Sequence, residues 1–112
     1  GSGLSDQYSN TTSRLQYNNT NTLGFYVGSR IATNDHKLYK NGLQVATTNL
    51  SSNLNLANDI IYLGAYKVGA GQGGQTTREC SFASFGKGLN ATKNANLFTA
   101  VQKYQTTLGR QV

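Results

Sequence analysis

The sequence predicts a mostly β fold that ends in a single α-helix. Only 37% of the 112 residues are apolar, proline and methionine are absent, and Asn, Thr, Ser and Gly are abundant. This composition is typical of short strands joined by polar turns. Several segments before residue 86 alternate apolar and polar residues, the period of a strand, whereas apolar residues after Asn90 recur every three or four positions. The second period is that of a helix.

The length of the chain allows one modest hydrophobic core, so we expect a single domain over residues 4–112. The opening residues 1–3, Gly-Ser-Gly, look like a cloning remnant, and an upstream part of the protein could have been removed with them. We expect no signal peptide before the domain, and no stretch approaches the roughly twenty apolar residues of a membrane span. We therefore expect no membrane insertion.

The N-terminal third is predicted to hold one weak strand and one strong one. Residues 4–21 are polar and rich in Asn, Thr and Ser, which favours a loop with one short edge strand. Residues 22–31 alternate with period two and predict a half-buried strand, in which Tyr26 lies on the face opposite its apolar neighbours.

A hairpin is predicted over residues 37–47. Two alternating runs flank Asn41-Gly42, the dipeptide that most readily adopts the two positive φ angles of a type I′ turn. The turn fixes the register of the two strands, so the hairpin is interpreted as scaffold, and function is expected in the loops around it.

Two further strands and a loop are predicted before the helix. Residues 59–66 and residues 78–85 are the strands, and the glycine-rich residues 68–77 form the loop between them. This loop is not a phosphate-binding loop, because it lacks the terminal Gly-Lys-Ser/Thr and no helix follows it.

The C-terminal segment predicts a helix of roughly five turns. Asn90 is a good N-cap and Gly109 is a stop signal. The apolar stripe of this helix, spaced by four, three and four residues, consists of Leu97, Val101, Tyr104 and Leu108.

The net charge of +6 favours an anionic partner or surface. The ten Lys and Arg residues are dispersed, with no two adjacent, so they do not form the basic row that neutralises phosphates. Nucleic acid is therefore not an expected partner.

Catalytic chemistry is not expected. The chain has four acidic residues, and only Asp59 and Glu79 are candidates for a glycosidase pair. Asp35 next to His36 is interpreted as a solvated pair at a turn rather than a catalytic one. One Cys and one His cannot form a zinc site, and Cys80 is predicted to be a small buried side chain. A weak calcium site around Asp35 or Asp59 remains an alternative to simple turn capping. No cofactor and no metal are predicted.

The seven tyrosines are the most informative side chains, because they offer rigid stacking faces for sugars or protein surfaces. Tyr62 and Tyr104 are predicted to be in the core. The predicted ligand-binding residues, which lie in or near loops or on the polar face of a strand, are Tyr66, Tyr39, Tyr26, Asp35 and Gln72.

Three segments in order, KLYKNGLQVAT, DIIYLGAY and ECSFASFGKGLNATKNANLFTAVQKYQTTLGRQV, resemble the C-terminal half of a concanavalin-like, laminin-G-type jelly roll. The resemblance covers residues 22–112. It implies an antiparallel β-sandwich with one C-terminal α-helix, in a form that lacks or shortens the N-terminal strands. The closing segment is similar to C-terminal modules of phage tail fibres and of secreted bacterial surface proteins. None of the family's calcium-binding or sugar-binding residues is transferred to this chain.

The resemblance implies a non-enzymatic recognition or attachment module, extracellular or on a virion surface. Its partner would be a cell-surface glycan or protein, and the chain would form a homo-oligomer, with a trimer as one form. The alternative is a structural or oligomerisation module of a fibre or virion without its own ligand. A third reading is a lyase or hydrolase acting on anionic polysaccharide.

Overall fold

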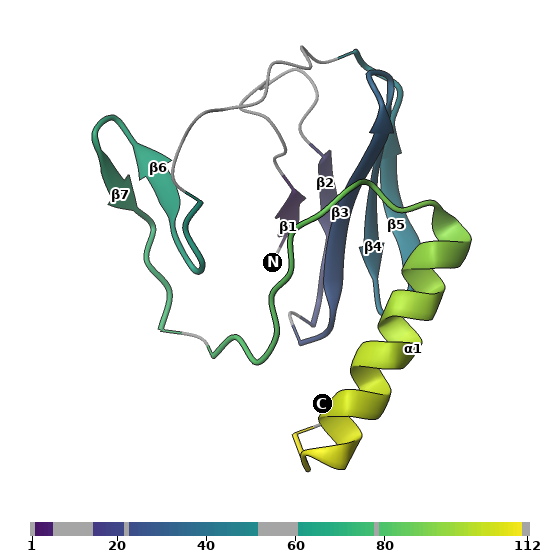
Figure 1. The fold of residues 1–112 in the computed structure, drawn as a ribbon. Helices are drawn as coiled ribbons and strands as arrows, with labels where there is room; N and C mark the ends of the chain where they lie inside the picture. The colour runs from purple at the N-terminus through teal and green to yellow at the C-terminus, as the bar shows by residue number, and fades with distance from the viewer. Residues whose placement is uncertain (1, 6–14, 22, 52–60, 78, 111–112) are drawn as a thin grey trace. The chain divides into compact units, whose positions relative to one another are not determined.

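A computed structural model describes residues 2–5, 15–21, 23–51, 61–77 and 79–110. The chain divides into two compact units: Gly1–Asn55 with Gly86–Val112, and Leu56–Phe85. The first unit carries the larger sheet and the helix, and the second carries one small hairpin (Figure 1). The described strands are all antiparallel, and the prediction of a β-rich fold with one C-terminal helix is confirmed.

The larger sheet has three strands in the order β3 (Tyr26–Ala32), β4 (Asp35–Lys40) and β5 (Leu43–Thr48). The predicted hairpin is confirmed, because Asn41 (φ 51°) and Gly42 (φ 79°) both take the left-handed conformation of a type I′ turn. The preceding strand begins at Tyr26, four residues later than predicted. The Asn41 side chain accepts a hydrogen bond from the Phe25 amide (2.8 Å), which ends the ladder at the turn.

The N-terminal segment contains two paired strands, β1 (Ser2–Ser5) and β2 (Leu15–Asn18), where a single short strand was predicted. β2 lies against β5 and β4 of the larger sheet. Leu15 on β2 and Leu38 on β4 are both buried. β2 therefore packs against the larger sheet within the first unit.

The central strand β4 is covered on both faces. Its alternation directs Leu38 and Lys40 to one face and Tyr39 to the other. Asn19, which follows β2, binds Lys40 on the first face. The second face contains Ser29, which binds the backbone of Leu89 just before the helix.

Because both faces of β4 are covered, the prediction that Tyr39 is exposed is wrong. Tyr39 is only 1% exposed, and its cross-strand neighbour is Val27, two residues from Ser29. In the sequence pattern Tyr39 falls on the polar face of its strand, which indicated that this face is exposed to solvent. That face is instead turned toward the segment that leads into the helix, so Tyr39 belongs to the core.

The helix α1 (Ala91–Thr107) is capped as predicted. The Asn90 side chain accepts a hydrogen bond from the Lys93 amide (2.9 Å), and Gly109 follows the helix with φ 67°. The chain before the helix passes very close to β3. A Cβ atom added to Gly88 would lie 2.0 Å from the carbonyl oxygen of Arg30, so this approach requires glycine.

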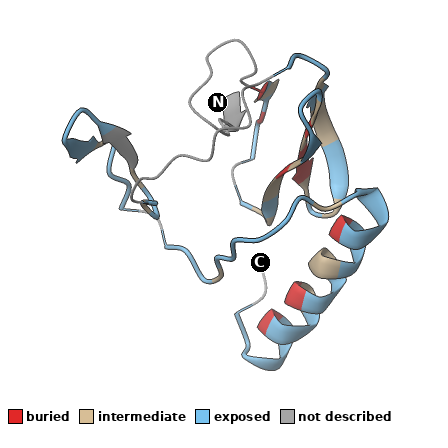
Figure 2. Cartoon of the chain, turned by 45° about the horizontal axis from the view of Figure 1, so that its top comes forward, coloured by how far each residue is buried: buried red, intermediate tan, exposed pale blue. Residues whose placement is uncertain are grey.

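The buried side of α1 differs from the predicted stripe. The buried residues are Asn94, Val101 and Gln105 (Figure 2). Phe98, between them on the helix surface, stacks on Phe25 with ring centroids 6.3 Å apart. The predictions that Tyr104 and Leu108 are buried are wrong, because they are 53% and 46% exposed. The helix is rotated relative to its apolar stripe.

The second unit contains a short hairpin, β6 (Tyr66–Val68) with β7 (Gly71–Gly73). The strand predicted over 59–66 is wrong for residues 61–65, which are not in a strand, and residues 59–60 lie outside the described part. The strand predicted over 78–85 is wrong for residues 79–85, and residue 78 is also outside the described part. β7 lies within residues 68–77, predicted as a loop.

The side chains of the second unit show why these strands do not form. Ile61 and Leu63 are exposed, so the alternation of their segment meets no core that would favour a strand. Cys80, predicted to be buried, is an exposed free cysteine. Tyr62 is half-buried rather than in the core.

Candidate functional site

The candidate site lies at the turn end of the larger sheet. Tyr26, the first residue of β3, is the cross-strand partner of Lys40, the last residue of β4. Both side chains therefore project from the same face, next to the turn at Asn41-Gly42. The chain that leaves β2 brings Asn19 and Asn21 to the same place. Together with Tyr17 on β2, these residues form what we call the tyrosine cluster: Tyr17, Asn19, Asn21, Tyr26 and Lys40.

Hydrogen bonds hold the Tyr26 ring in place. The Asn19 amide donates to the Tyr26 hydroxyl (2.8 Å), and the same hydroxyl donates to the Asn21 carbonyl (3.4 Å). The Lys40 ammonium donates to the Asn19 side-chain oxygen (2.9 Å) and to the Asn21 carbonyl. It also lies 5.6 Å from the centre of the Tyr26 ring, within the range of a cation–π contact. Tyr26 as a whole is 37% exposed, so its side chain is both held in place and accessible.

The two phenols of the tyrosine cluster have opposite pKa shifts. Burial raises the pKa of Tyr17 to about 12, and the neighbouring Tyr26 phenol adds to this rise. Burial also acts to raise the pKa of Tyr26, but the neighbouring Tyr17, the hydrogen bond from Asn19 and the nearby Lys40 with its positive charge lower it below 10.0 overall. A negative charge in the cluster would therefore settle on Tyr26, beside the ammonium.

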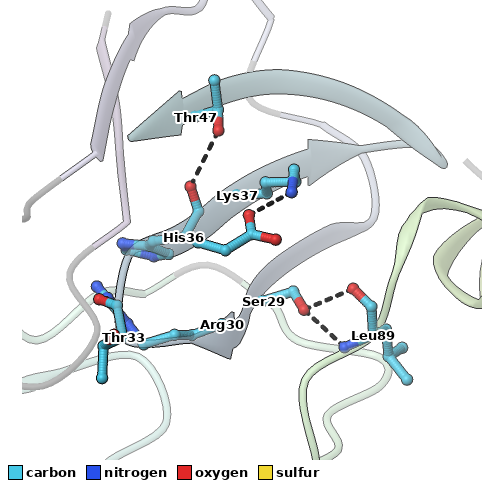
Figure 3. Close-up of polar contacts among 8 residues, drawn as sticks. Ser29, Arg30, Thr33, His36, Lys37, Thr47 and Leu89 are labelled. Carbon is cyan, nitrogen blue, oxygen red and sulfur yellow. Dashed lines mark hydrogen bonds and ion pairs between the residues drawn. The ribbon is translucent and has the colours of Figure 1, made fainter. Parts of the chain in front are cut away.

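The Asp35–His36 region lies at the other end of the sheet. Asp35 forms an ion pair with Lys37, and both side chains are partly exposed (Figure 3). His36 is fully buried, so the interpretation of Asp35 and His36 as a solvated pair is wrong for the histidine. The His36 carbonyl accepts a hydrogen bond from the Thr47 hydroxyl (3.3 Å), which is a contact of the strand ladder.

Arg30 is a half-buried charge that sequence reasoning missed. It is the cross-strand partner of His36, and its Nη1 donates to the Thr33 carbonyl (2.8 Å). Its Nε and Nη2 are buried with no hydrogen-bond partner among the described residues. The alternation of period two in this strand places Tyr26 and Arg30 on the same face of β3, and this pattern was the available signal for Arg30.

The structure brings together only one of the predicted ligand-binding residues with other candidate groups. Tyr26 lies in the tyrosine cluster, whereas Asp35 pairs with Ala32 at the opposite end of β3 and β4. Tyr39 is buried. Gln72 is exposed on β7 in the second unit, and Tyr66 begins β6 with its side chain outside the described part.

Asn19, Asn21 and Lys40 were missed because no local pattern distinguishes them from the many other polar residues. Within the described ranges, no group of three or more His, Cys, Asp or Glu side chains gathers as a metal would require. The helix of the described chain is not long and apolar enough to span a membrane.

Comparisons with known proteins return no match. No protein family matches the chain, and neither a curated protein nor a solved structure does. The likeness to concanavalin-like domains therefore stays a prediction from the sequence, and function has to be argued from the tyrosine cluster itself.

Proposed function

We propose that the chain is a non-enzymatic recognition module that binds carbohydrate on an extracellular or virion-borne surface through the tyrosine cluster. The observation that carries this proposal is that Tyr26 is 37% exposed while its hydroxyl is held by Asn19 and Asn21. Sugar rings stack on rigid aromatic faces, because little conformational entropy is lost when the aromatic side chain is already fixed.

The surroundings of Tyr26 add polar groups of the kind that orient a sugar. Asn21 is exposed, and Lys40 supplies an ammonium at the same end of the sheet. The net charge of +6 favours approach to an acidic cell surface. The same proposal includes the fold: a shortened concanavalin-like jelly roll that forms a module of a phage fibre or of a secreted adhesin.

A glycan array and whole-cell binding with the full chain test the proposal. We expect binding to a subset of glycans, and we expect Tyr26→Ala to abolish it by removing the stacking face. Tyr26→Phe keeps the ring and loses only the hydroxyl contacts, so it should retain part of the binding. Tyr104→Ala is the matched control, because it removes another exposed tyrosine of the same unit.

Two results would overturn the proposal: an array on which the folded chain is silent, or full binding by Tyr26→Ala. Circular dichroism and urea denaturation of each variant separate loss of binding from loss of folding. The Tyr26→Phe variant keeps the test decisive if Tyr26→Ala does not fold.

A structural or oligomerisation role is the second candidate. Leu23, between Asn21 and Tyr26 in the sequence, and Leu43, three residues after Lys40, are both large exposed apolar residues. Such residues are common where copies of a chain assemble. Sedimentation equilibrium that shows a trimer, lost in Leu43→Ser while the array stays silent, would favour this candidate.

A further inference from the structure

One side of α1 exposes apolar residues to solvent. We call it the exposed stripe, and its residues, spaced by four, three, four and four positions, are Lys93, Leu97, Ala100, Tyr104 and Leu108. These spacings place all five on one side of a helix. Four are exposed and Leu97 is half-buried. The exposed stripe therefore runs the length of the helix beside the buried residues.

The helix buries amides while it leaves these apolar groups in water. Asn94 is 0% exposed, and neither atom of its amide has a hydrogen-bond partner within the described residues. Gln105 is also buried. A helix that only had to cover its own sheet would be expected to turn its leucines and tyrosine inward. The observed rotation keeps Tyr104 and Leu108 available for another contact.

Contacts at the start of the helix are sufficient to fix this rotation. Ser29 holds the backbone of Leu89, and Gly88 approaches the carbonyl of Arg30. Phe98 stacks on Phe25 about two turns after the start of the helix. The rotation is therefore built into the packing of the first unit, and the exposed stripe is a stable feature of it.

The charges of the helix indicate the chemistry of a partner. The segment from Ala91 to Thr107 contains Lys93 and Lys103 and no acidic residue, and Arg110 follows it. A second copy carries the same net charge of +6, which opposes its approach to this side of the helix. Nucleic acid is disfavoured because the exposed stripe has one lysine among four uncharged side chains.

We propose that the exposed stripe is a docking surface for an acidic amphipathic helix of another protein. Leu97, Tyr104 and Leu108 would cover the apolar residues of that helix. Ala100, with its small side chain in the middle, permits close approach of the two backbones. Lys93 would pair with a carboxylate at one margin of the contact. This surface is distinct from the tyrosine cluster, so the inference does not depend on the proposed carbohydrate binding.

A designed peptide tests the inference with the full chain. The probe is a helix of about three heptads with Leu at a and d and Glu at e and g, and the comparison peptide has Lys in place of Glu. We expect the acidic peptide to bind, the basic peptide not to bind, and the affinity to fall when the salt concentration rises. Tyr104→Asp should weaken binding at least about tenfold, since it places a charge among apolar groups and repels the glutamates.

Two further variants define the surface. Lys93→Glu should weaken binding of the acidic peptide and strengthen binding of the basic one, which a purely structural role would not produce. Thr99→Asp is the matched control, because Thr99 is exposed on the opposite side of α1 and should leave binding unchanged. Isothermal titration calorimetry measures the affinity of each variant for each peptide.

Three results would overturn the inference. The first is that the acidic peptide does not bind. The second is that the chain self-associates in sedimentation and Tyr104→Asp abolishes the association, which would assign the exposed stripe to a second copy. The third is that anionic lipid vesicles compete with the peptide for the exposed stripe. Glycan binding that persists in Tyr104→Asp would show that the two surfaces are separate, so failure of one proposal would not be confused with failure of the other.

Discussion

The Ser29 hydroxyl makes two hydrogen bonds with the backbone of Leu89, sixty positions away in the sequence. It donates to the Leu89 carbonyl (2.7 Å) and accepts from the Leu89 amide (2.6 Å). One buried side chain thereby satisfies both polar groups of a residue next to the helix N-cap. The contact ties β3 to the start of α1, so it sets where the helix lies on the sheet.

Ser29→Ala should destabilise the first unit by about 1–3 kcal/mol, because it leaves the partly buried amide and carbonyl of Leu89 without their partner. Urea denaturation followed by circular dichroism measures the change. Ser51→Ala is the control, since Ser51 is exposed in the same unit and its substitution should change stability by less than about 0.5 kcal/mol. Equal effects of the two substitutions would contradict the role given to Ser29.

Gly88→Ala should be at least as damaging as Ser29→Ala. The added methyl group would lie 2.0 Å from the Arg30 carbonyl oxygen, so backbone would have to move, at a cost of about 1–3 kcal/mol or more. Gly86→Ala is a closely matched control, because the described part of the chain places nothing within 4 Å of its added Cβ. The difference between the urea midpoints of Gly88→Ala and Gly86→Ala measures the effect of the close approach of Gly88 to Arg30. No difference would show that the segment before α1 is not pinned to β3.

The elements that could be predicted from the sequence are those with local signals. The Asn41-Gly42 turn, the Asn90 cap and the Gly109 stop each act within a few residues, and all three are found where predicted. The burial of Tyr39 could not be predicted in this way. It depends on contacts between distant parts of the chain, such as Leu89, which binds Ser29 on the neighbouring strand β3.

The residues of the candidate site also divide into those with a local signal in the sequence and those placed by tertiary contacts. Tyr26 was found from its place on the polar face of a strand. Asn19 and Lys40 were not, because the first depends on how β2 lies over the sheet and the second on the register of β3 with β4. The rotation of α1 was missed for a similar reason. Periodicity identified an apolar stripe with Tyr104 and Leu108, but only tertiary contacts decide which side of a helix is covered.

Asn94→Leu should stabilise the first unit by about 1–2 kcal/mol. Asn94 is fully buried, and in the described structure neither atom of its amide has a hydrogen-bond partner, so an apolar side chain of similar size removes a desolvation cost. Asn96→Leu is the control on the exposed side of the same helix and should change stability little. Thermal and urea denaturation measure both variants. A destabilised Asn94→Leu would mean that the buried amide is satisfied and specifies the packing.

The tyrosine cluster predicts two unusual titrations. In an ultraviolet titration of tyrosinate, one phenol should ionise below 10.0 and another near pH 12, and these should be assigned to Tyr26 and Tyr17 by Tyr17→Phe. Lys40→Met should raise the pKa of Tyr26, because it removes both a hydrogen bond and a positive charge. An unchanged titration in Lys40→Met would contradict the contact between the ammonium and the phenol.

The same shifts give the stability a defined dependence on pH. The raised pKa of Tyr17 contributes stability that is complete below 10.0 and is lost as the pH rises toward about 12. The lowered pKa of Tyr26 contributes stability only above its folded pKa, and this contribution is complete above 10.0. Tyr17→Phe should therefore reduce the loss of stability between 10.0 and about 12, measured by urea denaturation at each pH. A steeper loss in that variant would contradict the assignment.

Gly42→Ala should destabilise the first unit for two separable reasons. The φ angle of 79° is strained for alanine by about 1–2 kcal/mol, and the added Cβ would lie 3.1 Å from the Phe98 ring. Gly109→Ala carries the first penalty without the second, since its φ is 67° and its added Cβ has nothing within 4 Å in the described structure. Urea denaturation of both variants should show a larger loss for Gly42→Ala. That difference measures the packing of the hairpin turn against α1, and equal losses would show that the turn does not support the helix.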